Sequence, residues 1–390
     1  MKRLIELDVL RAVLLLMMVV NHSPSQLRRF TDQPVGFFTT AEAFVFVSAL
    51  LAGMLFRRRT EKDGFTTARL STVQRAWRIY RAHLLTLAFA FMIGRFFSTD
   101  FPGVRNMLDH YLTNQWMAIP ASLVLLLRPP LMDILPMYIL FSLLTPVAFW
   151  VAGRWGWKTV ILLSAVVWLV SQARVMDLLA LACKDISYVQ LGPFDLLAWQ
   201  FLWICGLFFG QRFQGNGWVL RLPRFCTIGF GFLSVGFLAW RWSSIWIGID
   251  PNINTWLLDK WHLGILRLIN FFVTGWVIST FLRLPKSWEM PLRPLSRIGR
   301  QMLPVFCCQI CLSILLVCGI ESRNCPEWLT SFLVICQVAT VFLLAWFFET
   351  RSQERASRNQ ELKNARRSPE FVRSRHSAGN AVYPPELLTS

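Results

Sequence analysis

The sequence predicts an all-α fold: a polytopic integral membrane helix bundle of about ten transmembrane helices with one extra short helix. Hydrophobic residues make up 55% of the 390-residue chain, more than a soluble domain of this length can bury in one core. Apolar runs of about 20 residues follow one another along the chain and match the roughly 30 Å hydrocarbon layer of a bilayer. The net charge of +18 comes from basic residues between these runs, which indicates membrane topology and argues against nucleic acid as a partner.

Ten apolar runs are long enough to be predicted as membrane spans. The first contains Asp8 and Arg11 and lacks a small-residue cleavage pattern, so it is predicted to be a span rather than a signal peptide. In the second, the small residues Ala49 and Gly53 predict a close contact with another helix. In chain order the runs cover residues 4–21, 37–56, 80–97, 133–152, 157–176, 196–211, 224–242, 264–282, 302–319 and 329–348.

A further apolar segment, from Trp116 to Leu127, is too short to cross a bilayer. It has about twelve residues and contains Pro120, which favours a re-entrant or interfacial helix. If it were a full span, the basic loops that follow it would lie on the outer side, against the charge bias.

The distribution of Lys and Arg predicts the orientation of the bundle. The densest basic segment, from Arg57 to Arg81, lies between the second and third spans. Because basic loops stay in the cytoplasm, both termini are predicted to be cytoplasmic. Residues 1–348 then form one membrane domain, and the polar residues 349–390 are predicted to be a disordered, basic cytoplasmic tail.

Polar side chains on the first span connect two depths of the membrane. At 100° per residue, Arg11 and His22 lie on one face of the helix, about 16 Å apart along its axis. An arginine near the bilayer centre is unfavourable unless it faces protein or water. Arg11 therefore either contributes to a substrate path or forms an i,i+3 ion pair with Asp8.

Further polar residues are predicted to gather with His22 in the outer half of the membrane. They are Glu42, Asp133, Gln200, Arg267 and Asn270. A carboxylate beside an imidazole raises its basicity, as a general base for a hydroxyl group requires. Glu42 is the first candidate for this carboxylate and Asp133 the second, so the predicted catalytic residues are His22, Glu42 and Asp133. No spacing of His and Cys suits zinc, and no metal is expected.

Several segments resemble known proteins. The first span, LDVLRAVLLLMMVVNH, has an Arg followed by ten residues and then a His, and it resembles the signature of type 3 membrane acyltransferases. More narrowly, a set of blocks is similar to the OpgC family, which succinylates periplasmic glucans. These blocks are GFFTTAEAFVFVSALLAGMLF, RPPLMDILPMYILFSLLTPVAFW, FDLLAWQFLWICGLFFG and LGILRLINFF.

The resemblance implies a membrane O-acyltransferase of the bacterial inner membrane. The acyl group, expected to be succinyl, would pass from cytoplasmic acyl-CoA to hydroxyl groups of a periplasmic glucan or a related glycan. Acyl-CoA would be a donor substrate, and no bound cofactor is expected. His22 corresponds to the motif histidine, the base for the acceptor hydroxyl, and Arg11 to the motif arginine, which helps to hold the donor.

Gln200, Arg267 and Asn270 are expected to complete the contacts with substrate. Arg267 suits a succinyl carboxylate, because a guanidinium group forms two parallel hydrogen bonds to a planar anion. The alternative is an ion pair between Arg267 and one of the outer carboxylates of the protein.

Two other functions stay open from the sequence. Acetyl transfer to another envelope polysaccharide differs only in the acyl group and the acceptor. A secondary transporter or flippase of glycans would also place carboxylates and arginines inside the membrane. Transporters often contain internal repeats, and the two halves of this chain show no convincing repeat, which favours the enzyme.

Overall fold

The computed structural model describes residues 4–97, 101–182, 192–214, 217–218, 223–247, 256–281, 285–321 and 325–367. The elements in chain order are α1 (Ile5–Asn21), α2 (Arg28–Thr31), α3 (Thr40–Asp63), α4 (Phe65–Phe97), α5 (Pro102–Met107), α6 (Asp109–Thr113), α7 (Gln115–Leu123), α8 (Ile134–Ser171), α9 (Val175–Ala182), α10 (Leu196–Arg212), β1 (Phe213–Gln214), β2 (Gly217–Trp218), α11 (Arg224–Ile247), η1 (Trp256–Leu258), α12 (Ile265–Phe281), η2 (Lys286–Trp288), α13 (Arg293–Arg300), α14 (Met302–Glu321) and α15 (Glu327–Arg367). The two short strands form one antiparallel pair, and the other elements within these ranges are helical. The predicted helical fold is confirmed.

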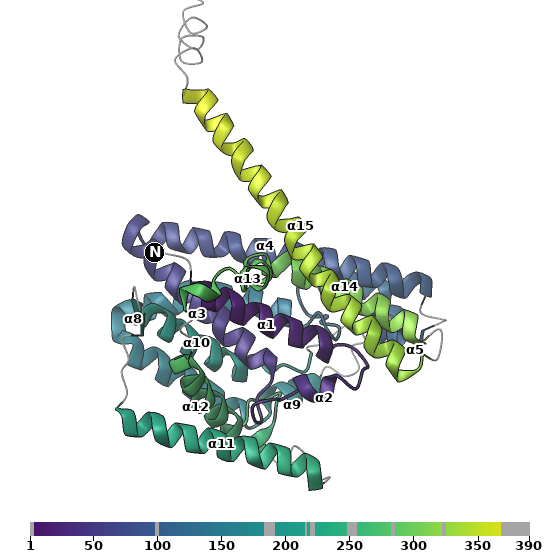
Figure 1. Ribbon diagram of the computed structural model, residues 1–390, viewed down its shortest axis with the longest axis horizontal. Helices are drawn as coiled ribbons and strands as arrows, with labels where there is room; N and C mark the ends of the chain where they lie inside the picture. Colours follow the sequence, from purple (N-terminus) through teal and green to yellow (C-terminus); the bar gives the residue numbers. More distant parts are fainter. Residues whose placement is uncertain are drawn as a thin grey trace, which may run out of the picture.

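The helices form one bundle around a large apolar core (Figure 1). Helix α10 packs against α3 and α8, and α4 packs against α8 and α3. Helix α1 crosses the middle of the view in Figure 1 and contacts α13 and α3. Helix α11 packs on α12 and forms the lower edge of the bundle in the same view. The indole rings of Trp199 and Trp203 on α10 are fully buried in the core.

Small residues bring α3 and α10 into backbone contact, as Ala49 and Gly53 predict. A Cβ atom at Gly53 would lie 2.5 Å from a carbonyl oxygen of α10. On α10, a Cβ at Gly206 would lie 2.5 Å from the Ala49 Cβ, and a Cβ at Gly210 would lie 2.0 Å from a carbonyl oxygen of α3. Larger side chains would push the helices apart. We call these four residues the α3–α10 seam; the seam confirms the predicted contact and sets the rotation of α3.

Helix α8 turns back on itself and covers both the fourth and the fifth predicted apolar runs. Gly156 interrupts it with φ 84° and ψ 161°, a conformation that glycine adopts readily. At its first end, Asp133 lies close enough to Lys260 for the lysine charge to act on it. At its other end, Gln172 Nε2 donates a 2.8 Å hydrogen bond to the His262 carbonyl oxygen. Because both ends meet the same loop, the chain reverses direction at Gly156.

The ten predicted membrane crossings are not confirmed. Within the described residues, five helices are long and apolar enough to cross a bilayer: Thr40–Asp63, Ile134–Ser171, Arg224–Ser243, Met302–Ile320 and Glu327–Glu361. Helices α1, α10 and α12 coincide with predicted spans but have 17 residues each, about 26 Å of helix against a hydrocarbon layer of roughly 30 Å. Helix α4 has 33 residues, but many of them are charged or polar.

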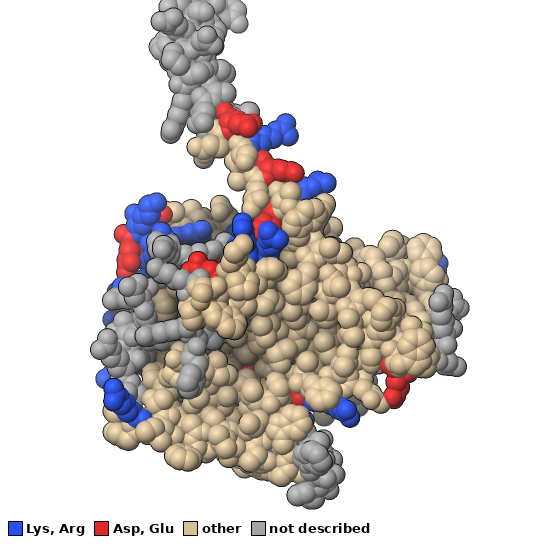
Figure 2. Space-filling model, in the orientation of Figure 1, with Lys and Arg blue, Asp and Glu red and all other residues tan. Residues whose placement is uncertain are grey.

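The outside of the bundle is apolar over a broad band. Figure 2 shows a broad face with few charged residues, in tan, with Lys and Arg at its left-hand edge and along the projecting part of α15. Exposed apolar side chains of the bundle include Leu162, Leu169, Phe232, Val235 and Leu343. Soluble proteins rarely expose contiguous apolar surface of this extent, so these positions indicate contact with lipid.

The short segment predicted to be a re-entrant or interfacial helix forms α7. It has nine residues with Pro120 inside, and the Asn114 side chain caps its start by accepting a hydrogen bond from the Met117 backbone N–H at 3.3 Å. The helix is confirmed, and its depth in a membrane stays a prediction.

Helix α15 projects from the bundle and continues to Arg367 (Figure 1). The tail predicted to be disordered from residue 349 is therefore helical over its first part, whereas residues 368–390 lie outside the described residues. The physical reason is that Glu, Gln, Arg, Lys and Ala are strong helix formers, and they extend a helix already nucleated by the apolar residues before them.

Candidate functional site

A cavity lined by arginines lies among α1, α3, α4, α8, α13 and α14, and we call it the arginine cavity. Its volume is about 770 Å³. Its charged lining residues are Arg11, Arg58, Arg59, Arg75, Arg78 and Arg300, with Asp8 as the one acid. Guanidinium groups form paired N–H hydrogen bonds to phosphate and carboxylate oxygens, so this cavity suits a polyanionic ligand.

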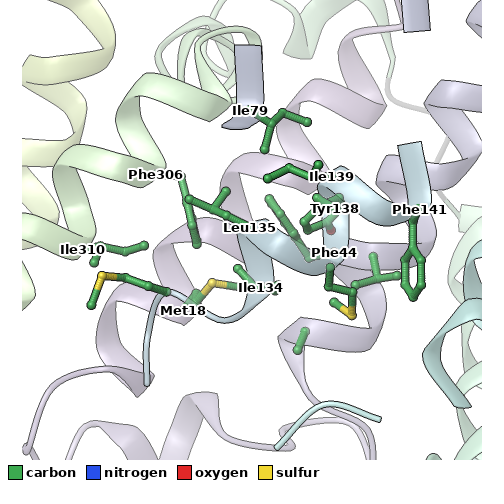
Figure 3. Close-up of a cluster of buried hydrophobic side chains, with 14 of the residues drawn as sticks. Met18, Phe44, Ile79, Ile134, Leu135, Tyr138, Ile139, Phe141, Phe306 and Ile310 are labelled. Atoms are coloured by element: carbon green, nitrogen blue, oxygen red, sulfur yellow. The ribbon is translucent and has the colours of Figure 1, made fainter. Parts of the chain in front are cut away.

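Toward the start of α3, the lining of the cavity includes a cluster of apolar side chains. Along α3 its lining extends from Arg59 to Phe44, about 22 Å of helix. Phe44 lies edge-on to Tyr138, with 5.7 Å between ring centroids, and stacks on Phe306 at 6.2 Å. Figure 3 shows these rings in one buried cluster with Ile134. We call Phe44, Ile134, Tyr138 and Phe306 the apolar plug.

Arg11 lies in the wall of the arginine cavity and is held by α13. Its Nη1 donates a 3.0 Å hydrogen bond to the Gly299 carbonyl oxygen. Helices α1 and α13 approach closely there, since a Cβ at Gly299 would lie 2.0 Å from the Asp8 carbonyl oxygen. Arg11 thus lines a cavity that suits an anion, and its contact with a donor molecule stays a prediction.

His22 lies at the other end of α1, about 16 Å along the helix axis from Arg11. It is the C-cap of α1, and its backbone N–H donates to the Met18 carbonyl oxygen at 3.0 Å. The side chain is half-buried, and its Nδ1 has no hydrogen-bond partner within the described residues. Burial and the positive charges of Lys260 and Arg28 lower the pKa of His22 to about 4. The imidazole is therefore neutral at pH 7 and can accept a proton.

Glu42 is not available to pair with His22, contrary to the prediction. It belongs to a capping box at the start of α3, where Oε2 accepts hydrogen bonds from the Thr39 backbone N–H at 3.0 Å and from the Thr39 hydroxyl. Its Oε1 accepts from Nε of Arg267 in a buried ion pair. Both oxygens of this carboxylate are engaged inside the fold, and the charges that act on His22, those of Lys260 and Arg28, lower its pKa.

Arg267 is fully buried, and its guanidinium group is bound by other residues of the protein. In addition to the Glu42 ion pair, its Nη1 donates a 3.2 Å hydrogen bond to the Leu258 carbonyl oxygen. Its Nη2 has no hydrogen-bond partner within the described part of the chain. Of the two alternatives for Arg267, the structure shows the ion pair with an outer carboxylate.

Gln200 and Asn270 are also engaged within the protein. Gln200 joins α10 to α8, because Oε1 accepts from the Ser164 hydroxyl at 2.6 Å and Nε2 donates to the Ser164 carbonyl oxygen at 2.8 Å. Asn270 holds the segment before α3: Oδ1 accepts from the Phe37 N–H at 2.7 Å, and Nδ2 donates to the Thr274 hydroxyl at 3.1 Å. Both amides are held inside the fold, and their contact with substrate stays a prediction.

Asp133 is the predicted carboxylate that remains near His22. It is buried at the start of α8, and its side chain does not cap the helix. Burial raises the pKa of Asp133 to about 7, opposed by the backbone N–H groups of Asp133 and Ile134 and by the charges of Lys260 and Arg128. Since Lys260 acts on both Asp133 and His22, the three side chains lie in one region. A carboxyl group with this pKa can take up or release a proton near neutral pH.

Lys260 belongs to the same region, although no sequence motif singles it out. It lies between η1 and α12, half-buried, with Nζ 4.7 Å from the centre of the Trp261 ring. A lysine beside an aromatic residue just before an apolar run is the available sequence signal, and it is too common to indicate a site. We call His22, Asp133 and Lys260 the His22 site. Among the described residues, no group of three or more His, Cys, Asp or Glu could hold a metal ion.

Comparison with known protein families identifies the family of the chain. A family model described as OpgC protein matches residues 3–353. The matched range contains every residue of the arginine cavity and of the His22 site. No curated protein and no solved structure matches the chain.

Proposed function

The chain belongs to the OpgC family, and from this premise we propose that it is a membrane O-acyltransferase that uses the arginine cavity for the donor and the His22 site for transfer. Family membership suggests a transferase that modifies glucans, and the apolar helices suggest a membrane protein. The proposed donor is cytoplasmic acyl-CoA, the acyl group succinyl, and the acceptor a hydroxyl group of a periplasmic glucan. One observation carries the proposal: α1 connects a polycationic cavity at one end to a neutral histidine at the other.

The charge of the arginine cavity supports acyl-CoA as the donor. Coenzyme A carries a diphosphate and a further phosphate, and guanidinium groups bind such oxygens in pairs. Arg58, Arg59 and Arg78 are exposed, as expected at the mouth of a cavity that takes its ligand from solvent. The thioester end of the bound molecule then points toward the apolar plug. There the buried Tyr138 hydroxyl, beside Ser48, offers a donor to the thioester carbonyl.

In the proposed reaction the apolar plug lies between the donor and the acceptor, so transfer requires its side chains to move. The contacts among the rings of Phe44, Tyr138 and Phe306 in the cavity lining support this role. A closed plug keeps water from the acceptor side away from the thioester, which limits wasteful hydrolysis. If the plug opens only when both substrates are bound, acyl transfer depends on the presence of both.

In the proposed reaction, the acceptor hydroxyl attacks the thioester carbonyl carbon. Neutral His22 accepts the hydroxyl proton as the new C–O bond forms. The tetrahedral intermediate then collapses with cleavage of the C–S bond, and the imidazolium returns the proton to the departing thiolate. The acyl group has moved from sulfur to oxygen and the proton from oxygen to sulfur. An ionised Asp133 would stabilise the transient imidazolium, which supports a role beside His22.

The charge distribution supports an orientation with the arginine cavity on the cytoplasmic side. Four of the six cavity arginines come from α3 and α4, around the most basic segment of the chain. By the positive-inside rule this segment is cytoplasmic, where acyl-CoA is available. The His22 site would then face the periplasm of a bacterial inner membrane, where the glucan acceptor lies.

Substitution of His22 by alanine tests the proposal. We expect periplasmic glucans from cells that carry His22→Ala to lack acyl substituents, with an unchanged amount of the protein in the membrane. Mass spectrometry of the glucans measures both the number and the mass of the substituents. His110→Ala, at a half-buried histidine of α6, is the matched control and should leave acylation unchanged.

The possible outcomes separate the competing functions. Unchanged acylation in His22→Ala would overturn the catalytic role of this residue. Substituents of acetyl mass in the wild type would select acetyl transfer instead of succinyl transfer. Reduced glucan export with unchanged decoration would indicate a transporter.

A further inference from the structure

The loop that carries Lys260 is fixed by side chains from three helices. We call residues 256–264 the Lys260 loop. Four of its backbone carbonyl oxygens accept side-chain hydrogen bonds: Leu258 from Arg267 at 3.2 Å, Trp261 from Trp199 at 2.9 Å, His262 from Gln172 at 2.8 Å and Leu263 from Trp168 at 3.0 Å. The donors belong to α12, to α10 and to the end of α8. A loop held at this many points presents its side chains in one arrangement, which lowers the entropy lost when a ligand binds.

Lys260 forms no ion pair within the described residues, although it is half-buried on this fixed loop. The carboxylates around it are used elsewhere. Glu42 pairs with Arg267, and Asp259 accepts from His262 at 2.8 Å. Asp32 and Asp133 are the remaining acidic neighbours. Neither forms an ion pair with Lys260 within the described residues, and the carboxyl group of Asp133 is only partly ionised near neutral pH. The lysine charge is therefore incompletely compensated.

The charges close to Lys260 favour an anionic ligand. Burial lowers the pKa of Lys260, and Arg267 and Arg28 act in the same direction, whereas Glu42 and Asp32 act in the opposite one. An anion beside the ammonium group would offset both the burial and the repulsion from the two arginines. A neutral sugar hydroxyl would offset neither.

We infer that Lys260 binds the free carboxylate of a dicarboxylic acyl group, such as succinyl, when that group lies at the His22 site. This inference rests on the proposed function, and it names the residue that selects the acyl group. The donor enters from the arginine cavity with its acyl end leading. The part of the acyl chain beyond the thioester carbonyl therefore points away from the cavity, toward the side of the bundle on which Lys260 lies.

The geometry of a short dicarboxylic chain agrees with this placement. In a succinyl group, two methylene groups separate the reacting carbonyl from the terminal carboxylate, so both ends must be bound within one small site. His22 and Lys260 lie close enough for the lysine charge to act on the imidazole. Arg267, the other candidate for this carboxylate, is engaged by Glu42 and by the Leu258 carbonyl group.

Donor selectivity of the full-length protein in detergent tests the inference. Succinyl-CoA is compared with butyryl-CoA, whose acyl chain also has four carbons but ends in a methyl group. The acceptor is periplasmic glucan from a strain that lacks the gene. We expect Lys260→Met to lower kcat/KM for succinyl-CoA about 10- to 100-fold more than kcat/KM for butyryl-CoA, the range for loss of a hydrogen bond to a charged group.

Two further variants serve as controls. Lys260→Arg keeps the positive charge and should retain most succinyl transfer. Lys158→Met removes an exposed lysine of α8 outside the site and should change neither donor. Where butyryl transfer is too slow to follow, its inhibition constant against succinyl transfer replaces it.

An equal loss for both donors in Lys260→Met, or no loss for either, would overturn the inference. The proposed function fails in a different way. If the wild-type protein transfers neither acyl group from coenzyme A, or if His22→Ala keeps full transfer, the acyltransferase assignment is wrong and the role of Lys260 falls with it.

Discussion

The arginine cavity and the His22 site are built in opposite ways. In the cavity, positive charge is shared among six long side chains, several of them exposed. In the His22 site, each side chain is positioned by a single element. His22 lies at the end of α1, Asp133 lies at the start of α8, and Lys260 lies on a loop that neighbouring side chains hold in place. A site whose charge comes from several side chains still binds its ligand when one of them is removed. A site that depends on one fixed side chain loses its function when that side chain is removed. Substrate affinity and transfer rate should therefore respond to different substitutions.

The largest effect on stability is expected at the buried ion pair between Glu42 and Arg267, which helps to hold the Lys260 loop. Glu42→Gln removes the partner of Arg267, whose charge is fully buried. Leaving such a charge unpaired should lower the free energy of unfolding by about 3–5 kcal/mol. Thermal unfolding of the detergent-solubilised protein measures this change. The double variant Glu42→Leu with Arg267→Met should recover much of it, because no charge then stays buried. A Glu42→Gln variant as stable as the wild type would contradict the rigid description of this region.

The next effect concerns proton transfer at the His22 site. Asp133→Asn should lower kcat about 100-fold if the carboxylate assists the imidazole. Because the pKa of Asp133 is raised to about 7, wild-type kcat should rise as pH increases through about 7 and the carboxylate forms. This rise should be absent in Asp133→Asn. Initial rates measured across that pH range check both points, and a variant that keeps the rise would assign it to another group.

The same substitution has a predictable effect on stability. A raised pKa means that the folded state binds the proton of Asp133 more tightly than the unfolded state does. Ionised Asp133 therefore destabilises the fold above pH 7, and this penalty disappears as pH falls below the ordinary pKa of 3.8. Asp133→Asn should be more stable than the wild type at pH 8 and show little difference at pH 4, as measured by thermal unfolding.

A smaller effect is expected from any single arginine of the cavity. Arg59→Gln or Arg78→Gln should raise the KM for acyl-CoA about threefold to tenfold with kcat unchanged, since the remaining arginines still bind the phosphates. The double variant should lose more, and the KM should rise with salt because exposed charges are screened. Arg154→Gln, an exposed arginine of α8 outside the cavity lining, is the control. A fall in kcat without a change in KM would remove the contrast between the two regions.

The smallest effect is expected at His262, on the Lys260 loop. Its hydrogen bond to Asp259 raises the pKa of His262, and the charges of Asp177 and Asp195 add to this, while burial opposes it. A raised histidine pKa stabilises the folded state fully below pH 6.5, and the contribution is lost as pH rises through the folded-state pKa. The difference in Tm between the wild type and His262→Gln should therefore be larger at pH 6 than at pH 9. An equal difference at both values would show that the contribution of His262 is not ionic.

The helices could be located from hydropathy, but the number of crossings could not. Apolar runs of about 20 residues correspond to α1, α3, α4, α8, α10, α11, α12, α14 and α15. Hydropathy cannot distinguish a helix surrounded by lipid from one surrounded by other helices. Helix α10 is an example of the second kind, since Trp199 and Trp203 are fully buried by α3, α8 and the Lys260 loop.

The candidate site was predictable where one helix decides the geometry. Arg11 and His22 share a face of α1, and the 3.6-residue period places them without further information. The pairing of Glu42 with Arg267 joins residues 225 positions apart, so no local pattern contains it. From the sequence, other acidic and basic residues at a similar depth were equally good candidates for an ion pair with Glu42 or Arg267. Lys260 was missed because its position depends on a loop conformation set by α8, α10 and α12.

The α3–α10 seam leaves one side of α3 free to change. At 100° per residue, Leu51 and Leu55 of the cavity lining lie on roughly the opposite face of the helix from Ala49 and Gly53. Exchanging these leucines for smaller or larger residues would reshape the arginine cavity without disturbing the main-chain contact behind it. Redesign toward longer, branched or unnatural substituents can therefore begin on this face, while the glycines of the seam stay constant.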